Sequence, residues 1–377
     1  MEPFRIAVTD TAVADLRDRL RRTRWPDAVD GAGWEYGTDP GYLREITDYW
    51  ATTFDWRAQE RRLNTFAQFG IAVDGRRVHG VLERGRGPAP LPVLVLHGWP
   101  GSFVQMLDLL PLLTDPAAHG GAAGDAFDVV VGSLPGFAFS DAARRPGLGA
   151  VAMAHRFHRL MTRQLGYRRY AVRGSDFGAS VAEQLGAFYP EAVVGLHLSG
   201  TTPRADDPPA RPSPAVRQYI EDVRRWRAVE VGYGGQQSTR PQTLAYALND
   251  SPVGLAGWIL EKFRRWSDCE GPDGRDVERR FTKDQLLTNI SVYWFTATIG
   301  SSIRMYYETE REQPRRPDVP AAWLMSSKDM FPTPREWVER AARVDRWTAV
   351  DRGGHFIEWE EPQLVAEDMR QFFRALR

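Results

Sequence analysis

The chain has 377 residues, 42% hydrophobic and 26% charged, a composition typical of a globular protein with a large core. Lys plus Arg and Asp plus Glu both number 49, so net charge gives no reason to expect nucleic acid or an anionic membrane as a partner. The single cysteine, Cys269, excludes an internal disulfide, and neither a signal peptide nor an apolar run approaching ~18 residues is present. We therefore expect a soluble, cytoplasmic protein.

The first part of the chain predicts two helices and a hairpin. Residues 10–24 carry apolar side chains on one stripe, and a second helix follows over residues 40–50, where proline suits the first turn. Residues 65–73 and 77–84 alternate apolar and polar side chains around an Asp-Gly turn, which is typical of a hairpin. The Gly- and Pro-rich stretch at residues 85–92 then predicts a linker.

Beyond that linker the chain alternates strands and helices. Apolar runs bounded by turn residues predict buried strands at 93–96, 128–131, 170–172 and 193–198, with helical patterns between them. Such alternation requires crossover connections and therefore a parallel sheet. In sheets of this kind, ligands bind beyond the carboxyl ends of the strands.

The alternation stops at a proline-rich stretch that includes Pro203, Pro208 and Pro214. Residues 214–312 are helical and aromatic-rich with no evident strand, and sheet pattern resumes near residue 322. We interpret the intervening part as an inserted helical lid. The predicted division is an N-terminal extension (1–90), an α/β core in two parts (91–205 and 318–377) and a lid (206–317).

One strand leads into Gly-Ser-Asp-Phe-Gly at residues 174–178, the pattern of a nucleophile elbow between a strand and a helix. Gly174 and Gly178 suit it because strand and helix approach too closely for a Cβ atom. The usual serine is replaced by Asp176, whose carboxylate, with a reference pKa of about 3.9, is already an anion at neutral pH. Such a group can attack saturated carbon without a base. Taken alone, the pattern also fits a loop with an acidic tip.

A catalytic Asp176 requires a histidine late in the chain. His355 lies in a Gly-Gly-His-Phe loop between a predicted strand and a C-terminal helix. Asp329, which follows the strand at residues 322–327, is the first candidate to orient it, and Asp351 is the alternative. The order nucleophile, acid, histidine is that of the α/β-hydrolase fold.

Two backbone N–H groups are expected to form an oxyanion hole: that of Phe177, directly after Asp176, and that of Trp99 in the loop after an earlier strand. His97 is interpreted as a residue that shapes the Trp99 loop. His155 and His158 have the spacing of a metal pair on a helix, but no carboxylate is in register with them, so no metal is expected.

Several motifs resemble the microsomal-type epoxide hydrolases, and the similarity covers nearly the whole chain. His-Gly-Trp-Pro-Gly-Ser-Phe at 97–103, Gly-Ser-Asp-Phe-Gly at 174–178 and Arg-Gly-Gly-His-Phe at 352–356 match the core motifs of that family. The stretches 247–256 and 259–263 match its lid. The resemblance implies an α/β-hydrolase fold with an N-terminal extension that packs around core and lid.

The resemblance also implies roles for individual residues. Asp176 matches the nucleophile that forms a hydroxyalkyl ester, His355 the base that activates water, and Asp329 the acid that orients the base. Tyr233 and Tyr306 match two lid tyrosines that protonate the epoxide oxygen. Tyr293 and Tyr307 are the alternatives for these two positions.

Two departures from the family pattern stand out: Phe177 occupies a position where tryptophan is common, and the membrane anchor of the mammalian members is missing. The expected reaction converts an epoxide and water to a vicinal diol without a cofactor. A dehalogenase shares the aspartate nucleophile and is the main alternative. Two further alternatives are another kind of hydrolase and a binding protein with an inactive hydrolase fold. The natural epoxide, its biological role and any homo-oligomer are left open.

Overall fold

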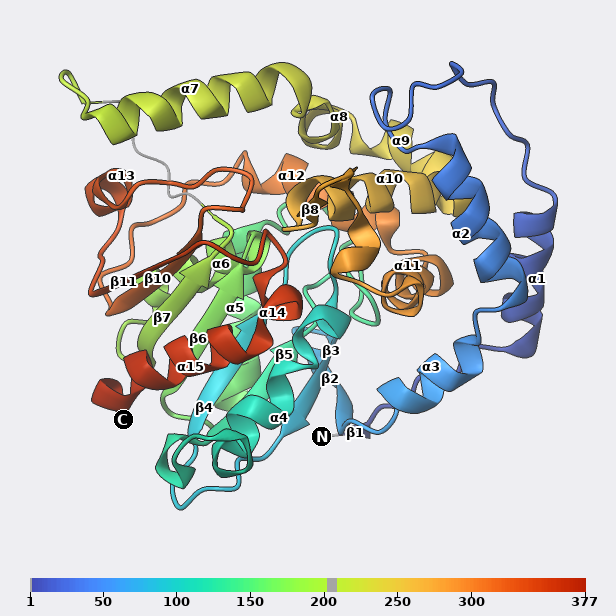
Figure 1. Ribbon diagram of the computed structural model, residues 1–377. Helices are drawn as coiled ribbons and strands as arrows, with labels where there is room; N and C mark the ends of the chain where they lie inside the picture. The colour runs from blue at the N-terminus through green and yellow to red at the C-terminus, as the bar shows by residue number, and fades with distance from the viewer. Residues whose placement is uncertain (1, 202–208) are drawn as a thin grey trace.

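A nine-stranded sheet forms the centre of the computed structural model, which describes residues 2–201 and 209–377 (Figure 1). The strands β4, β5, β6, β7, β10 and β11 are parallel to one another, whereas β1, β2 and β3 join one edge in antiparallel pairs. In spatial order they are β1 (Glu2–Pro3), β2 (Gln68–Val73), β3 (Arg76–Glu83), β5 (Phe127–Gly132), β4 (Leu91–Leu96), β6 (Tyr170–Ser175), β7 (Val193–Ser199), β10 (Ala321–Ser326) and β11 (Arg346–Val350).

Helices cover both faces of this sheet, which is why the central strands are apolar without alternation. On one face α4 (Leu109–Thr114) packs against α15 (Pro362–Phe373), and on the other α5 (Ala150–Arg159) packs against α6 (Phe177–Phe188). Val93, Leu94, Val95 and Leu96 of β4 are all fully buried. The parallel α/β architecture predicted from strand–helix alternation is confirmed.

The N-terminal residues form α1 (Asp10–Arg21), α2 (Pro40–Thr52) and α3 (Trp56–Leu63) before the hairpin β2–β3. The sequence did not predict α3, because its two buried side chains, Trp56 and Leu63, are separated by six polar or small residues. These helices lie beside α10 (Pro252–Trp266) and α11 (Lys283–Thr296), as Figure 1 shows, and the buried Trp50 indole donates to Ser291 Oγ of α11 at 3.1 Å.

A group of helices covers the carboxyl ends of the parallel strands (Figure 1). These cap helices are α7 (Pro214–Val229), α8 (Gly232–Thr239), α9 (Pro241–Asp250), α10 (Pro252–Trp266), α11 (Lys283–Thr296) and α12 (Ile299–Thr309). The expectation of no strand here is wrong: β8 (Glu270–Gly271) and β9 (Gly274–Arg275) form a short hairpin over a tight turn. Pro203, Pro208 and the predicted boundary at 205/206 lie outside the described residues.

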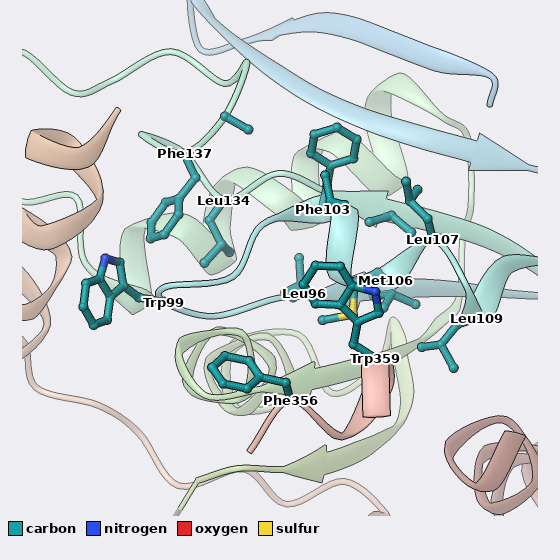
Figure 2. Packing of buried hydrophobic residues seen from close by; sticks show 14 of the residues in the cluster. Leu96, Trp99, Phe103, Met106, Leu107, Leu109, Leu134, Phe137, Phe356 and Trp359 are labelled. Atoms are coloured by element: carbon teal, nitrogen blue, oxygen red, sulfur yellow. The ribbon is translucent and has the colours of Figure 1, made fainter. Parts of the chain in front are cut away.

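The last part of the chain returns to the sheet. After β10 come α13 (Arg335–Ala341), which the sequence did not predict, and β11, followed by the single turn α14 (Ile357–Glu360). Figure 2 shows that α14 and the short helix η1 (Phe103–Met106) contribute Trp359 and Met106 to the same buried cluster. Across residues 2–201 and 209–377, no helix combines the length and apolar character needed to span a membrane.

Candidate active site

Asp176 lies at the sharp turn between β6 and α6, with φ 51° and ψ −125°. Such a positive φ is uncommon for a residue other than glycine and is the strained geometry of a nucleophile elbow. A Cβ on Gly174 would lie 2.3 Å from the carbonyl oxygen of Gly178, and one on Gly178 would lie 2.2 Å from that of Leu96. Both glycines are therefore required by the close approach of helix and strands, as the sequence predicts.

One carboxylate oxygen of Asp176 is bound by the loop that follows β4. The backbone N–H of Trp99 donates to Asp176 Oδ1 at 2.9 Å. Phe177 is the first residue of α6, where a backbone N–H has no carbonyl partner within its own helix. Of the two backbone donors named from the sequence, the Trp99 N–H thus binds Asp176 directly, whereas the Phe177 N–H stays a predicted donor.

The Trp99 loop is itself fixed by neighbouring groups. His97 is fully buried, with Nδ1 donating to the Gly98 carbonyl at 3.0 Å and Nε2 accepting from Leu134 N–H at 3.3 Å. Burial lowers the pKa of His97 to about 4, so its imidazole is neutral. From α11, the Tyr293 hydroxyl donates to the Gly101 carbonyl at 2.6 Å. The position of the Trp99 N–H therefore depends on both the core and a cap helix.

His355 lies between two carboxylates. Its Nδ1 is 3.0 Å from Asp329 Oδ1, and its Nε2 is 3.4 Å from Asp176 Oδ2. The first distance is that of a hydrogen bond, whereas the second is long for one. Asp329 is fixed in turn by the backbone N–H of Met330 at 2.6 Å. Asp351, the alternative acid, is exposed in the turn after β11.

Two aromatic side chains of the cap helices cover this arrangement. Tyr233 of α8 stacks on the Trp99 indole with ring centroids 5.7 Å apart, and Tyr306 of α12 meets the same indole edge to face at 5.7 Å. The two tyrosine rings are 6.0 Å apart, and Tyr306 also packs against Phe177 at 4.6 Å. The structure therefore brings both predicted tyrosines to the residues that flank Asp176.

The alternative tyrosines are engaged elsewhere. The hydroxyl of Tyr293 donates its hydrogen bond to the Gly101 carbonyl. Tyr307, next to Tyr306 on α12, lies under the Arg311 guanidinium, whose carbon is 3.5 Å from the tyrosine ring centroid.

The two predicted tyrosines are protonated at neutral pH. Burial raises the pKa of both Tyr233 and Tyr306, and the nearby charge of Asp176 acts in the same direction. Both phenols are thus protonated at neutral pH and able to donate.

Comparisons with known proteins agree with this geometry. The family described as the epoxide hydrolase N terminus matches residues 1–106, and the alpha/beta hydrolase fold family matches residues 92–253. "Epoxide hydrolase 1" of Sus scrofa is 34% identical over 415 residues, which cover 100% of this chain and 89% of the relative. A protein of Stigmatella aurantiaca is 39% identical over 379 residues, covering 100% and 85% respectively. The chain belongs to the epoxide hydrolase family.

Solved structures give the same result for the fold of this epoxide hydrolase. The juvenile hormone epoxide hydrolase of the silkworm Bombyx mori superposes with a TM-score of 0.90 at 29% identity, covering 100% of this chain and 94% of that one. The epoxide hydrolase of Aspergillus niger gives a TM-score of 0.86 at 27% identity, with 100% and 96% coverage. These names support an epoxide-opening enzyme rather than a dehalogenase or an inactive hydrolase frame.

The sequence did not assign a role to Trp266, at the end of α10. Its ring packs against Tyr233 at 5.1 Å and against His355 at 5.3 Å, and its carbonyl accepts the His355 backbone N–H at 2.8 Å. The available signal was its position directly after the lid motif at residues 259–263. Sequence alone could not place it, because α10 and the histidine loop are about ninety residues apart.

Among the residues that the structure describes, neither of the two histidines with metal-pair spacing, His155 and His158, forms an ion pair with a carboxylate. His155 Nδ1 is 2.8 Å from the Tyr189 hydroxyl, and the His158 ring stacks on Tyr189 at 3.5 Å. In the described ranges 2–201 and 209–377, no three His, Cys, Asp or Glu side chains are placed to bind one ion. Both histidines thus pack from α5 onto Tyr189, directly after α6.

Two surface hollows differ in their relation to the site. The larger, about 1000 Å³, lies between residues 19–44 and the helices α9 and α10, away from Asp176. The smaller, about 880 Å³, is lined in part by Phe177 and Tyr306. The second hollow therefore adjoins the site because Phe177 and Tyr306 line it, although it is the smaller of the two.

The charge state of His355 follows from its surroundings. Burial lowers its pKa, but the negative charges of Asp329 and Asp176 outweigh burial and raise the pKa of His355 to about 10. In the free enzyme at neutral pH, His355 is therefore an imidazolium between two carboxylates. The unfolded chain has no such neighbours, and its histidine has a pKa of about 6.5.

This difference predicts a pH-dependent stability. The ion triad stabilises the folded enzyme fully below about pH 6.5 and loses that effect as the pH rises towards 10, by up to about 1.4 kcal/mol per pH unit. We expect the difference in unfolding free energy between the enzyme and its His355→Gln variant to shrink across this window. Denaturant unfolding at several pH values measures it, and a constant difference would contradict the assigned charge state.

Proposed function

We propose that this epoxide hydrolase opens its substrate through a covalent hydroxyalkyl ester on Asp176. One observation carries the proposal: the two oxygens of the elbow carboxylate have different environments. Oδ1 accepts the Trp99 N–H at 2.9 Å, whereas Oδ2 lies 3.4 Å from His355 Nε2 and has no backbone donor within residues 2–201 and 209–377. This difference supports Oδ1 as the oxygen that carries charge in a tetrahedral intermediate and Oδ2 as the oxygen that attacks carbon.

In the first step Asp176 Oδ2 forms a bond to an epoxide carbon as the bond from that carbon to the ring oxygen breaks. The ring oxygen takes a proton from Tyr233 or Tyr306, which leaves a hydroxyalkyl ester and a phenolate. An alkoxide has a proton affinity near that of hydroxide, with water at a pKa of about 15.7, so a buried phenol remains the stronger acid. General acid catalysis of this kind contributes about 10²–10⁴ in rate.

In the second step neutral His355 removes a proton from water, and the resulting hydroxide attacks the Asp176 carbonyl carbon. The Trp99 and Phe177 N–H groups stabilise the negative Oδ1. Breaking the ester bond releases the diol as His355 returns its proton to the departing oxygen. The new carboxyl group then reprotonates the tyrosine. His355, which released one proton to solvent when the ester formed, takes one back as the charge of Asp176 returns, and this restores the starting enzyme.

The first step prepares His355 for the second. The charge of Asp176 is one reason why the pKa of His355 is raised. Ester formation removes this charge, so the pKa of His355 falls and the neutral imidazole becomes more populated. The neutral form of His355, which acts as the base, is therefore favoured when the ester is present.

We also propose that the cap helices act as the lid, because they carry both tyrosines.

A single turnover in heavy-oxygen water tests the ester. With excess enzyme and an epoxide such as styrene oxide, we expect the label in the carboxylate of Asp176 and not in the first diol released. Mass spectrometry of the Asp176 peptide and of the diol measures both. Label that enters the diol directly would show that water attacks the epoxide, and the nucleophile assignment would then fail.

A further inference from the structure

The turn α14, directly after the histidine loop, carries two carboxylates whose side chains have no exposed surface, Glu358 and Glu360. The mechanism above uses neither. Glu358 accepts from Arg173 Nη2 at 2.7 Å and from Gln105 Nε2 at 2.9 Å. Arg173 lies on β6 three residues before Asp176, and Gln105 lies in η1 directly after the Trp99 loop. Glu358 therefore fixes α14 to the two segments that carry the elbow and the Trp99 N–H.

Glu360 fixes the histidine loop itself. Its Oε2 accepts the backbone N–H of Asp268 at 2.7 Å and that of Gly354 at 2.9 Å, and its Oε1 accepts the N–H of Phe356 at 3.1 Å. Gly354 and Phe356 are the two residues that flank His355. One buried carboxylate thus binds the backbone on both sides of the proposed base and, through Asp268, the loop that follows α10.

The loop at residues 266–268 meets the histidine loop along its backbone. The His355 N–H donates to the Trp266 carbonyl at 2.8 Å, and the Gly353 N–H donates to Asp268 Oδ2 at 3.1 Å. A Cβ on Gly354 would lie 2.5 Å from the same Trp266 carbonyl oxygen, so the two loops touch with no side chain between them. The backbone of the base is therefore positioned by the cap as well as by the sheet.

We propose that Glu360 is a positioning residue for His355, and that it sets the base for ester hydrolysis by joining the histidine loop to residues 266–268. The inference rests on the proposed function, because it assigns Glu360 to the second of the two steps. Glu360 contacts the backbone beside His355, whereas the contacts of Asp176, Trp99, Tyr233 and Tyr306 described above do not involve it. Ester formation should therefore not depend on Glu360.

Glu360→Gln separates the two steps. Glutamine keeps the shape of the side chain but has one acceptor oxygen instead of two, and its NH₂ group would face a backbone N–H donor. The histidine loop is then expected to shift. Because a displacement of about 1 Å at a catalytic group can cost about 10²-fold in rate, we expect ester hydrolysis to slow by about 10–100-fold. Ester formation should remain within about threefold of the unmodified enzyme.

Glu361→Gln is the matched control. The neighbouring Glu361 is also a carboxylate on this segment, but it pairs with Arg280 at 3.2 Å and Arg352 at 3.4 Å and is part-exposed. Within the part of the chain that the structure describes, its carboxylate accepts no hydrogen bond from the backbone of Gly354 or Phe356. Both half-reactions should be unchanged in this variant. Rapid quenching with mass spectrometry of the Asp176 peptide gives the rates of ester formation and decay.

Selective slowing of ester decay in Glu360→Gln supports the inference. Equal slowing of both steps, or of neither, overturns it and indicates a structural role alone. If Glu360→Gln does not fold, Glu360→Asp decides in the same assay. It keeps the carboxylate but shortens the side chain by one CH₂ group, so the three backbone N–H groups cannot all be reached, and selective slowing of ester decay is again expected. If the unmodified enzyme forms no ester, the proposed mechanism itself fails. This outcome is distinguishable from failure of the Glu360 inference, because it is observed without any variant.

Discussion

Replacing His355 by Gln is expected to arrest the enzyme at the ester. Asp176 is an anion without help from His355, so ester formation should continue, whereas the second step loses its base. The proposed base is worth about 10²–10⁴ in rate, and turnover should fall by that factor. One equivalent of epoxide should then accumulate as added mass on the Asp176 peptide, measured by quenching the enzyme with excess substrate.

The neighbourhood of His355 makes this test specific. Its Nδ1 is bound to Asp329 at 3.0 Å, so Asp329→Asn should show the same accumulation to a smaller extent. Asp351→Asn provides the control, because that carboxylate is exposed in the turn after β11. A His355→Gln variant that turns over at the normal rate would place the base elsewhere.

Replacing Tyr233 and Tyr306 together by Phe is expected to block the opposite step. Without a phenol, the ring oxygen would leave as an unprotonated alkoxide, and ester formation should slow by about 10²–10⁴-fold. Each single variant should lose less, because both hydroxyl groups belong to one cluster over Trp99. The rate at which the Asp176 peptide gains the mass of one epoxide, followed by rapid quenching in a single turnover, measures the loss.

Tyr307→Phe is the matched control for the double variant. Tyr307 is adjacent to Tyr306 on α12, but its ring lies under Arg311, and removal of its hydroxyl should leave ester formation within about twofold of normal. Normal ester formation in the double variant would show that the leaving group needs no proton from these tyrosines. That result would favour a dehalogenase, whose halide leaving group needs no proton.

Local sequence signals were sufficient for the central parallel strands and the elbow. Runs such as 93–96 and 170–172 are apolar without alternation because both faces of a parallel sheet are covered, and the structure has strands at both places. Gly174 and Gly178 bracket Asp176 because backbone packing excludes a Cβ at either position. In contrast, α3 was missed, since two anchors, Trp56 and Leu63, among charged residues give too weak a periodic signal.

The sequence by itself determined a parallel α/β fold, an aspartate at a strand–helix elbow and a histidine in a late loop, because each depends on neighbouring residues. Only the tertiary structure decided which groups meet. Asp329, and not Asp351, lies 3.0 Å from His355, and Trp266 and Glu360 approach the same loop from different segments. Such contacts join segments that are distant in the chain, so they depend on how the cap packs on the sheet and leave no local pattern.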